Sequence, residues 1–170
     1  QVTHLEKAEM GWTIKTDKGA DIQAAAVIIA AGAGAFGPNR PPLEGIETYE
    51  GISVFYMVKR REDFRDKKIV IAGGGDSAVD WANSLSEVAA SVTVIHRRDK
   101  FRASPESVAQ MQSNPRIALK VPSQLKALEG NDGQLSAVIL DNMNGGEIKL
   151  EADCLLPFYG LAANLGPIAT

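Results

Sequence analysis

A glycine-rich run has the residue types of a turn that can hold a pyrophosphate. It reads Gly73-Gly74-Gly75-Asp76-Ser77-Ala78 and fits the pattern G-x-G-x-x-A. In such a turn the first glycine permits a tight bend, the second lets a phosphate approach the backbone, and the small last residue lets a helix pack closely on a strand. Free N–H groups at the start of that helix would face the phosphate oxygens. Glycine triplets also occur in plain turns, so the flanking sequence decides between these interpretations.

The flanking segments predict a strand, a helix and a second strand. Residues 67–72 end in a continuous apolar run, which suits a strand covered on both faces. Small and apolar residues then recur at helical spacing, at Ala78, Trp81, Ala82 and Leu85. Residues 91–95 form a second buried-strand pattern. This order predicts a βαβ unit with parallel strands and a right-handed crossover.

Basic residues stand where the second predicted strand ends. His96, Arg97 and Arg98 follow it directly, and Arg102 comes shortly afterwards. A domain specific for NAD would place an acidic residue here to bind the ribose hydroxyls, whereas guanidinium groups attract a 2′-phosphate. The pattern predicts a preference for NADP over NAD, with His96 packed beside the adenosine rather than shuttling a proton. The alternative is a solvated basic loop.

The N-terminal part predicts strands and a connector. Alternating residues before position 19 predict a small antiparallel meander, and the apolar run 26–30 predicts a buried strand. Pro38, Pro41, Pro42 and Gly45 predict an interdomain connector over residues 37–47.

The C-terminal part predicts one more helix and several strands. Ser104 is expected to cap a helix with Pro105 in its first turn, and Asn114-Pro115 to end it. Further strand patterns occur at 117–121, 125–128, 135–140 and 148–150, with glycine-containing turns at 130–133 and 144–146. We predict that these four strands form a β-meander beside the βαβ unit and that residues 154–160 form another buried run.

Composition limits the function classes. The chain has 170 residues, is 45% hydrophobic and carries a formal charge of −3, so no general basic field would attract nucleic acid or an anionic membrane. The single cysteine, Cys154, allows no internal disulfide or Cys-x-x-Cys pair and is expected in the core. No apolar stretch has the length of a membrane span. We expect a cytoplasmic protein without a metal site.

Two stretches together resemble a known family. Residues 68–82 and 94–103 are similar to the NADPH domain of the thioredoxin reductase-like flavoproteins. Within that group the chain most resembles the thioredoxin reductase-type ferredoxin–NADP⁺ reductases, because it lacks the Cys-x-x-Cys pair of thioredoxin reductases. The closing residues 165–168, Leu-Gly-Pro-Ile, also resemble the ferredoxin reductase branch.

The resemblance implies an α/β fold in three parts. Residues 1–46 would be part of an FAD-binding domain, 47–151 a Rossmann-like NADP(H)-binding domain with a parallel sheet and a β-meander, and 152–170 a truncated return to the FAD domain. Ala31 and Gly32 would lie against FAD, although the family often has Thr or Ser at position 31. The glycine-rich FAD fingerprint is missing, which implies a piece of a longer enzyme that binds NADPH yet holds FAD poorly or not at all.

The implied activity is hydride transfer between nicotinamide and flavin, followed by single-electron transfer to ferredoxin or a similar small carrier. Residues 73–78 with His96, Arg97, Arg98 and Arg102 would hold NADP(H), and no catalytic acid or nucleophile is required in this segment. The family also implies a homodimer. Alternatives are a thioredoxin reductase-like protein with another acceptor and a non-catalytic NADPH-sensing module.

A second basic cluster precedes the glycine run. Lysines and arginines outnumber acidic residues between positions 59 and 68. This surplus could steer an acidic ferredoxin, or it could be the solvated face of a connector helix.

Overall fold

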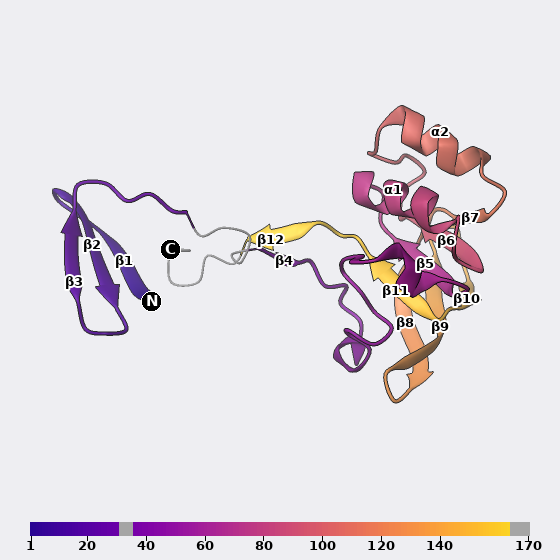
Figure 1. The fold of residues 1–170 in the computed structure, drawn as a ribbon, viewed down its shortest axis with the longest axis horizontal. Helices are drawn as coiled ribbons and strands as arrows, with labels where there is room; N and C mark the ends of the chain where they lie inside the picture. The colour runs from indigo at the N-terminus through magenta and orange to yellow at the C-terminus, as the bar shows by residue number, and fades with distance from the viewer. Residues whose placement is uncertain (31–35, 164–170) are drawn as a thin grey trace. The chain divides into compact units, whose positions relative to one another are not determined.

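The computed structural model describes residues 1–30 and 36–163. The chain divides into two compact units. The central unit comprises residues 38–160, and the terminal unit comprises residues 1–37 with 161–170. Figure 1 shows the elements of both. Each unit is described by itself.

A four-stranded parallel sheet forms the middle of the central unit. Its strands are β5 (Lys68–Ala72), β6 (Ser91–Ile95), β7 (Ile117–Lys120) and β11 (Cys154–Pro157). They lie in the order β11-β5-β6-β7, and every neighbouring pair is parallel. In order of appearance this is 4-1-2-3, so the chain reverses its direction of winding between β5 and β11. Ligands of doubly wound sheets bind at the carboxyl ends of the strands at such a switch point.

Two helices cover one face of this sheet. Helix α1 (Asp76–Leu85) follows the glycine turn, and α2 (Pro105–Ser113) follows β6, as the sequence predicted. Ser104 Oγ accepts the Ser107 N–H at 3.2 Å, and Pro105 occupies the first turn, where its missing N–H costs nothing. Asn114 ends the helix.

An antiparallel sheet covers the other face. It consists of β8 (Ser123–Asn131), β9 (Gln134–Asn142) and β10 (Glu147–Glu151), a meander that occupies the crossover between β7 and β11. Asp132 and Gly133 join β8 to β9 with φ values of 49° and 77°. Two successive positive φ values are typical of a type I′ hairpin turn.

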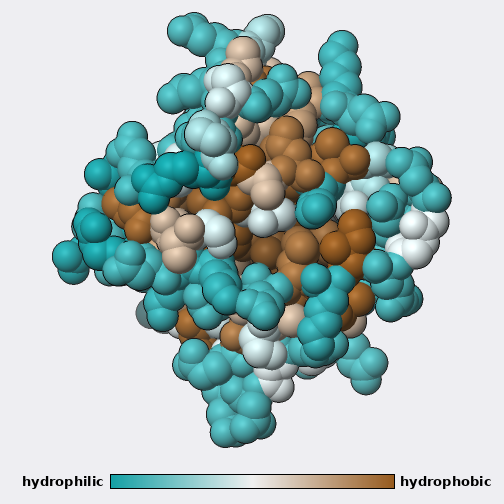
Figure 2. All heavy atoms as spheres, turned by 90° about the vertical axis from the view of Figure 1, so that its right-hand side faces the viewer, coloured by the Kyte–Doolittle hydropathy of each residue, from teal (hydrophilic) through white to brown (hydrophobic). Residues whose placement is uncertain are grey.

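The sheet separates two apolar layers because successive side chains of a strand point to opposite faces. Ile69 and Ile71 pack with the helices, whereas Val70 and Ala72 pack with the antiparallel sheet. Figure 2 views this end of the central unit and shows apolar side chains in the middle of the face, with hydrophilic residues around them. Because alternate side chains of β5 pack into the two layers, this strand is covered on both faces, as its continuous apolar sequence predicted.

The terminal unit contains the predicted N-terminal meander. Strands β1 (Val2–Ala8), β2 (Gly11–Thr16) and β3 (Asp21–Ala24) form an antiparallel sheet. Short strands β4 (Phe36–Pro38) and β12 (Leu161–Ala163) form a two-stranded sheet. The central unit also contains two described 3₁₀ turns, η2 (Ile46–Thr48) and η3 (Arg61–Phe64).

Two strand predictions were wrong. Residues 26–30 form no strand, and Ile28 and Ile29 are 91% and 52% exposed. An apolar run becomes a strand only where neighbouring strands satisfy its backbone, and no described strand pairs with this one. Residues 117–120 do form a strand, but it joins the parallel sheet beside β6 and not the meander.

The compact units also differ from the predicted domain boundaries at 46/47 and 151/152. Leu43 and Ile46 are buried in the apolar layer between the parallel sheet and the antiparallel sheet, so residues 38–46 pack into the central unit. Strand β11 pairs with β5, so residues 152–160 also belong there. Within the described ranges, no helix is long and apolar enough to cross a membrane.

The cysteine gives a test of the core. Burial raises the pKa of the Cys154 thiol to about 11, and the residue is 6% exposed. Because the thiolate is the reactive form, the folded protein should react with an aromatic disulfide reagent at pH 8 at least about a hundredfold more slowly than the protein in denaturant. Equal absorbance traces in the two conditions would contradict the buried position.

Candidate nucleotide-binding site

A pocket lies at the carboxyl ends of the parallel strands. Its volume is about 680 Å³. Three chain segments that follow β5, β6 and β11 meet there, together with the start of β8 and the segment before η2. The lining residues are Asn39, Pro41, Pro42, Gly73, Gly74, Gly75, Ile95, His96, Arg97, Arg102, Ser123, Gln124, Leu125, Phe158, Tyr159 and Gly160. The pocket thus occupies the switch point between β5 and β11.

The first glycine of the turn is fixed by close packing. Gly73 has φ +155°, and a Cβ there would lie 2.6 Å from the Phe158 carbonyl oxygen and 3.1 Å from Ala78 Cβ. Its N–H donates to the Ile95 carbonyl at 3.0 Å, and the Phe158 N–H donates to the Ala72 carbonyl at 2.8 Å. The ends of β11, β5 and β6 therefore meet at Ala72 and Gly73, and a side chain at Gly73 would separate them.

The third glycine borders open space. A Cβ at Gly75 would meet nothing within 4 Å. Gly75 precedes α1, and its carbonyl accepts the N–H groups of Ala78 and Val79, while those of Asp76 and Ser77 donate to no described acceptor. The backbone therefore presents unused donors at a helix N-terminus, next to empty space, as a bound pyrophosphate requires.

The loop after β6 is fastened to the glycine turn. The Arg102 N–H donates to the Gly74 carbonyl at 2.7 Å, and the Ser104 N–H donates to Asp76 Oδ1 at 3.1 Å. The Asp76 carboxylate therefore joins the starts of α1 and α2. This hydrogen bond within the protein keeps the basic loop in one position relative to the turn.

His96 fills the space beside the middle glycine. A Cβ at Gly74 would lie 2.4 Å from His96 Nε2, and the His96 ring stacks on Phe101 with centroids 5.3 Å apart. Nε2 is enclosed and has no hydrogen-bond partner among the described residues. Burial lowers the pKa of His96, and the charges of the neighbouring arginines act in the same direction, against a hydrogen bond with the Lys100 backbone. The imidazole is therefore neutral at pH 7 and acts as a packing group.

The arginines of the loop differ in position. Arg97 and Arg102 line the pocket, whereas Arg98 is exposed and does not line it. Along the described chain, neither these three nor Lys100 pairs with a carboxylate, although ion pairs form elsewhere in the central unit. Exposed cations held beside a pocket without acidic partners are available to an anionic ligand.

Several lining residues were not expected from the sequence. Asn39 donates its N–H to the Gly160 carbonyl at 3.0 Å and its side-chain amide to the Tyr159 carbonyl at 3.2 Å. It thus holds the segment after β11, on which Tyr159 faces the pocket. Ser123 and Gln124 enter from the start of β8. No local pattern marks these residues, because only the tertiary fold brings them to the strand ends.

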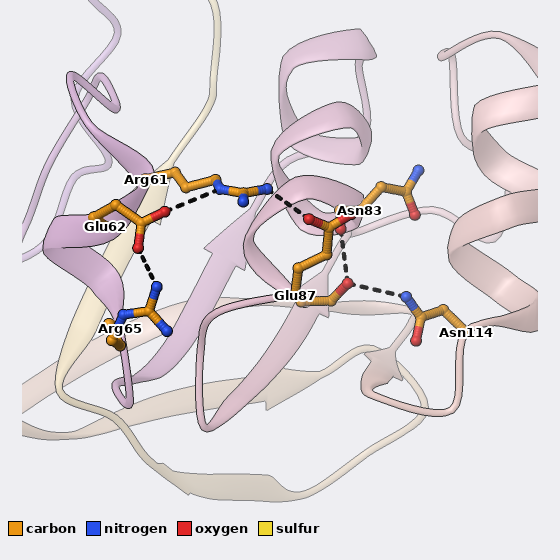
Figure 3. Close-up of polar contacts among 7 residues, drawn as sticks. Arg61, Glu62, Arg65, Asn83, Glu87 and Asn114 are labelled. Carbon is orange, nitrogen blue, oxygen red and sulfur yellow. Dashed lines mark hydrogen bonds and ion pairs between the residues drawn. The ribbon is translucent and has the colours of Figure 1, made fainter.

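Three of the six lysines and arginines in the second basic cluster form ion pairs in the described structure. Only a 3₁₀ turn forms at residues 61–64, not the connector helix considered above. Figure 3 shows Arg61 bonded to Glu87 and Glu62, and Arg65 bonded to Glu62. Lys68 pairs with Glu151 at 2.5 Å. These contacts favour a solvated, internally paired surface over a field that steers an acidic partner.

Two predicted residues cannot be placed. Ala31 and Gly32, the expected contacts of FAD, lie outside the described residues. Within the described part of the chain, no group of three or more His, Cys, Asp or Glu side chains is arranged to hold a metal ion.

The fold is that of the doubly wound dinucleotide-binding domains, with a glycine turn and a cationic loop at the switch point. The chain belongs to the pyridine nucleotide-disulphide oxidoreductase family, whose family model matches residues 1–142.

The chain is also similar to individual named proteins. The chain is 62% identical over 161 residues to a ferredoxin–NADP reductase of Rhodospirillum rubrum, and 59% identical over 173 residues to one of Paramagnetospirillum magneticum. These alignments include 93% and 99% of this chain but 47% and 51% of the relatives, so the chain spans about half their length. Among solved structures, thioredoxin reductase of Lactococcus lactis matches 99% of the chain with a TM-score of 0.84 and 26% identity, covering 55% of that protein.

The glycine turn supplies a paired test. Gly73→Ala should lower the free energy of unfolding by about 2–4 kcal/mol, because the new Cβ meets backbone that cannot move aside and φ is unfavourable for alanine. Gly75→Ala is the matched control. It should change stability by less than about 1 kcal/mol, because its Cβ enters open space. Urea unfolding of both variants measures the difference, and equal losses would contradict the geometry.

Proposed function

We propose that this chain is the NADP(H)-binding part of a flavoprotein oxidoreductase of the ferredoxin–NADP⁺ reductase type. The observation that carries the proposal is the pocket itself. It is lined by guanidinium groups without a carboxylate partner in the described structure and by the glycine turn that opens α1, whose first N–H groups have no described acceptor. A ligand with both a pyrophosphate and a further phosphate uses both features. NADP(H) has this chemistry, whereas NAD(H) lacks the 2′-phosphate.

The local charge pattern supports the preference for NADP. Arg97 and Arg102 face the pocket at the end of β6, where NAD-specific domains place an acidic residue. Each charge-assisted hydrogen bond to the 2′-phosphate contributes about 1.5–3 kcal/mol. The fastening of the loop to Gly74 and Asp76 means that little further ordering is needed on binding.

The residues of this chain position the nucleotide and do not react. When bound, NADPH and FAD supply the hydride-transfer chemistry themselves. We propose that the described residues contribute a backbone cradle at Gly73–Gly75 and phosphate contacts from the loop after β6. The buried thiol of Cys154 has no part in this.

The wider assignment rests on the relatives. Proteins 50–62% identical to this chain are named ferredoxin–NADP reductase. We therefore propose ferredoxin, or a similar small electron carrier, as the acceptor of the complete enzyme, FAD as its second cofactor, a cytoplasmic location and a homodimeric state. The terminal unit would belong to the FAD-binding domain. The single cysteine allows no dithiol pair within this chain.

Single arginine variants test the nucleotide preference. Arg97→Ala and Arg102→Ala should each weaken NADP⁺ binding about 10- to 150-fold while leaving the weaker NAD⁺ binding within about threefold. Arg98→Ala is a matched control for general charge loss and should have the smaller effect, because Arg98 does not line the pocket. Isothermal titration of the 170-residue chain with both nucleotides provides the measurement. Parallel losses for NADP⁺ and NAD⁺ would argue against a 2′-phosphate site.

The acceptor requires a separate test. A flavoprotein of the relatives' length that contains this chain should reduce ferredoxin with NADPH much faster than with NADH. Flavin absorbance and ferredoxin reduction are followed in one stopped-flow experiment. Bleaching of the flavin by NADPH without reduction of any iron–sulfur acceptor would reject ferredoxin and leave nucleotide binding intact.

A further inference from the structure

Ser123 combines burial with an unused hydroxyl. It is 2% exposed and lies at the start of β8. Its backbone N–H donates to the His96 carbonyl, and no hydrogen bond of its hydroxyl with a described residue is found. Among the described residues, the fully enclosed side-chain atoms without a partner are Asn83 Oδ1 and His96 Nε2, so Ser123 Oγ keeps some accessible surface. The pocket is the space that Ser123 borders. A nearly buried hydroxyl without a protein partner lowers the stability of the fold unless water or a ligand forms a hydrogen bond with it.

The pocket has two chemically different sides. On the helix side lie the glycine turn, the start of α1 and the basic loop, whose Phe101 and Ala103 pack with the helices. On the opposite side Ile95 and Leu125 belong to the apolar layer of the antiparallel sheet, and Pro41 and Pro42 precede Leu43 of that layer. The first side suits phosphates. The second suits a flat apolar ring with a few polar edge atoms.

The order of the strand ends matches the order of groups in adenosine nucleotides. The glycine turn follows β5, the arginines follow its neighbour β6, and Ser123 follows the next strand, β7. The Ser123 N–H donates to the His96 carbonyl at 2.8 Å, which fixes Ser123 beside the end of β6. Moving along the sheet by about 4.8 Å per strand, a ligand would meet pyrophosphate, ribose phosphate and base contacts in sequence.

We propose that Ser123 is a specificity-determining residue whose hydroxyl bonds the N1/N6 edge of the adenine base. The inference rests on the proposed function, because it assumes that the pocket holds an adenine nucleotide. The hydroxyl can donate to N1 or accept from the exocyclic amino group. Ile95, Leu125 and the two prolines line the same pocket as Ser123, whereas the neighbouring Gln124 is exposed.

Ser123→Ala tests the inference by separating binding from stability. In isothermal titration of the 170-residue chain, the variant should bind NADP⁺ about three- to tenfold more weakly, the ordinary effect of one lost neutral hydrogen bond. Binding of 1,N⁶-etheno-NADP⁺, whose N1/N6 edge is blocked, should be weaker than that of NADP⁺ to the wild type and should change less than about twofold in the variant. The melting temperature without ligand should not fall, because no protein hydrogen bond is lost.

Ser53→Ala is the matched control. Ser53 is also 2% exposed, but its hydroxyl donates to the Gly133 carbonyl at 2.7 Å. This variant should melt several degrees lower and bind NADP⁺ as the wild type does.

Three outcomes overturn the inference alone: unchanged NADP⁺ binding by Ser123→Ala, equal weakening of both nucleotides, or a loss of stability like that of Ser53→Ala. If the wild type binds neither NADP⁺ nor its etheno analogue, the proposed function itself fails.

Discussion

The site depends on the attachment of the loop after β6 to the glycine turn. Two hydrogen bonds, from the Arg102 N–H to Gly74 and from the Ser104 N–H to Asp76, join the loop to the start of α1. Ser104 then caps α2, so the two helices begin from one hydrogen-bonded junction. Because the arginines have no acidic partner among residues 1–30 and 36–163, their mutual repulsion would favour an open loop. The backbone attachment opposes that repulsion and keeps the charges at the pocket before any ligand arrives.

The small residues of the turn are needed for this attachment. Gly73 lets the ends of three strands approach, and Gly74 leaves room for the His96 ring, which packs between the turn and Phe101. Burial is the main cause that lowers the pKa of His96, because it disfavours a charged imidazole. The positive charges of three nearby arginines lower it further. The neutral histidine thus fills the space beside Gly74 without adding to the positive charge of the loop.

Local features of the fold could be predicted from sequence, and non-local ones could not. The βαβ unit and the Ser104 cap follow from residues a few positions apart, so periodicity and capping chemistry located them. The run 26–30 has the same apolar character as β5 but forms no strand, because strands depend on neighbours that a local pattern does not show. β7 similarly has a strand pattern that says nothing about which sheet it joins.

The same distinction applies to the pocket. Its phosphate side is built from two short segments, and their glycines and arginines form patterns that predict phosphate binding from the sequence. Its apolar side draws single residues from β6, β8 and the segment after β4, none of which forms a motif. Asp76 illustrates a further limit, because a carboxylate inside a phosphate-binding pattern suggests a ligand contact, yet its partner is the Ser104 backbone. Sequence motifs therefore identify the groups that attract charge, whereas the fold selects the groups that shape and orient the remainder of the ligand.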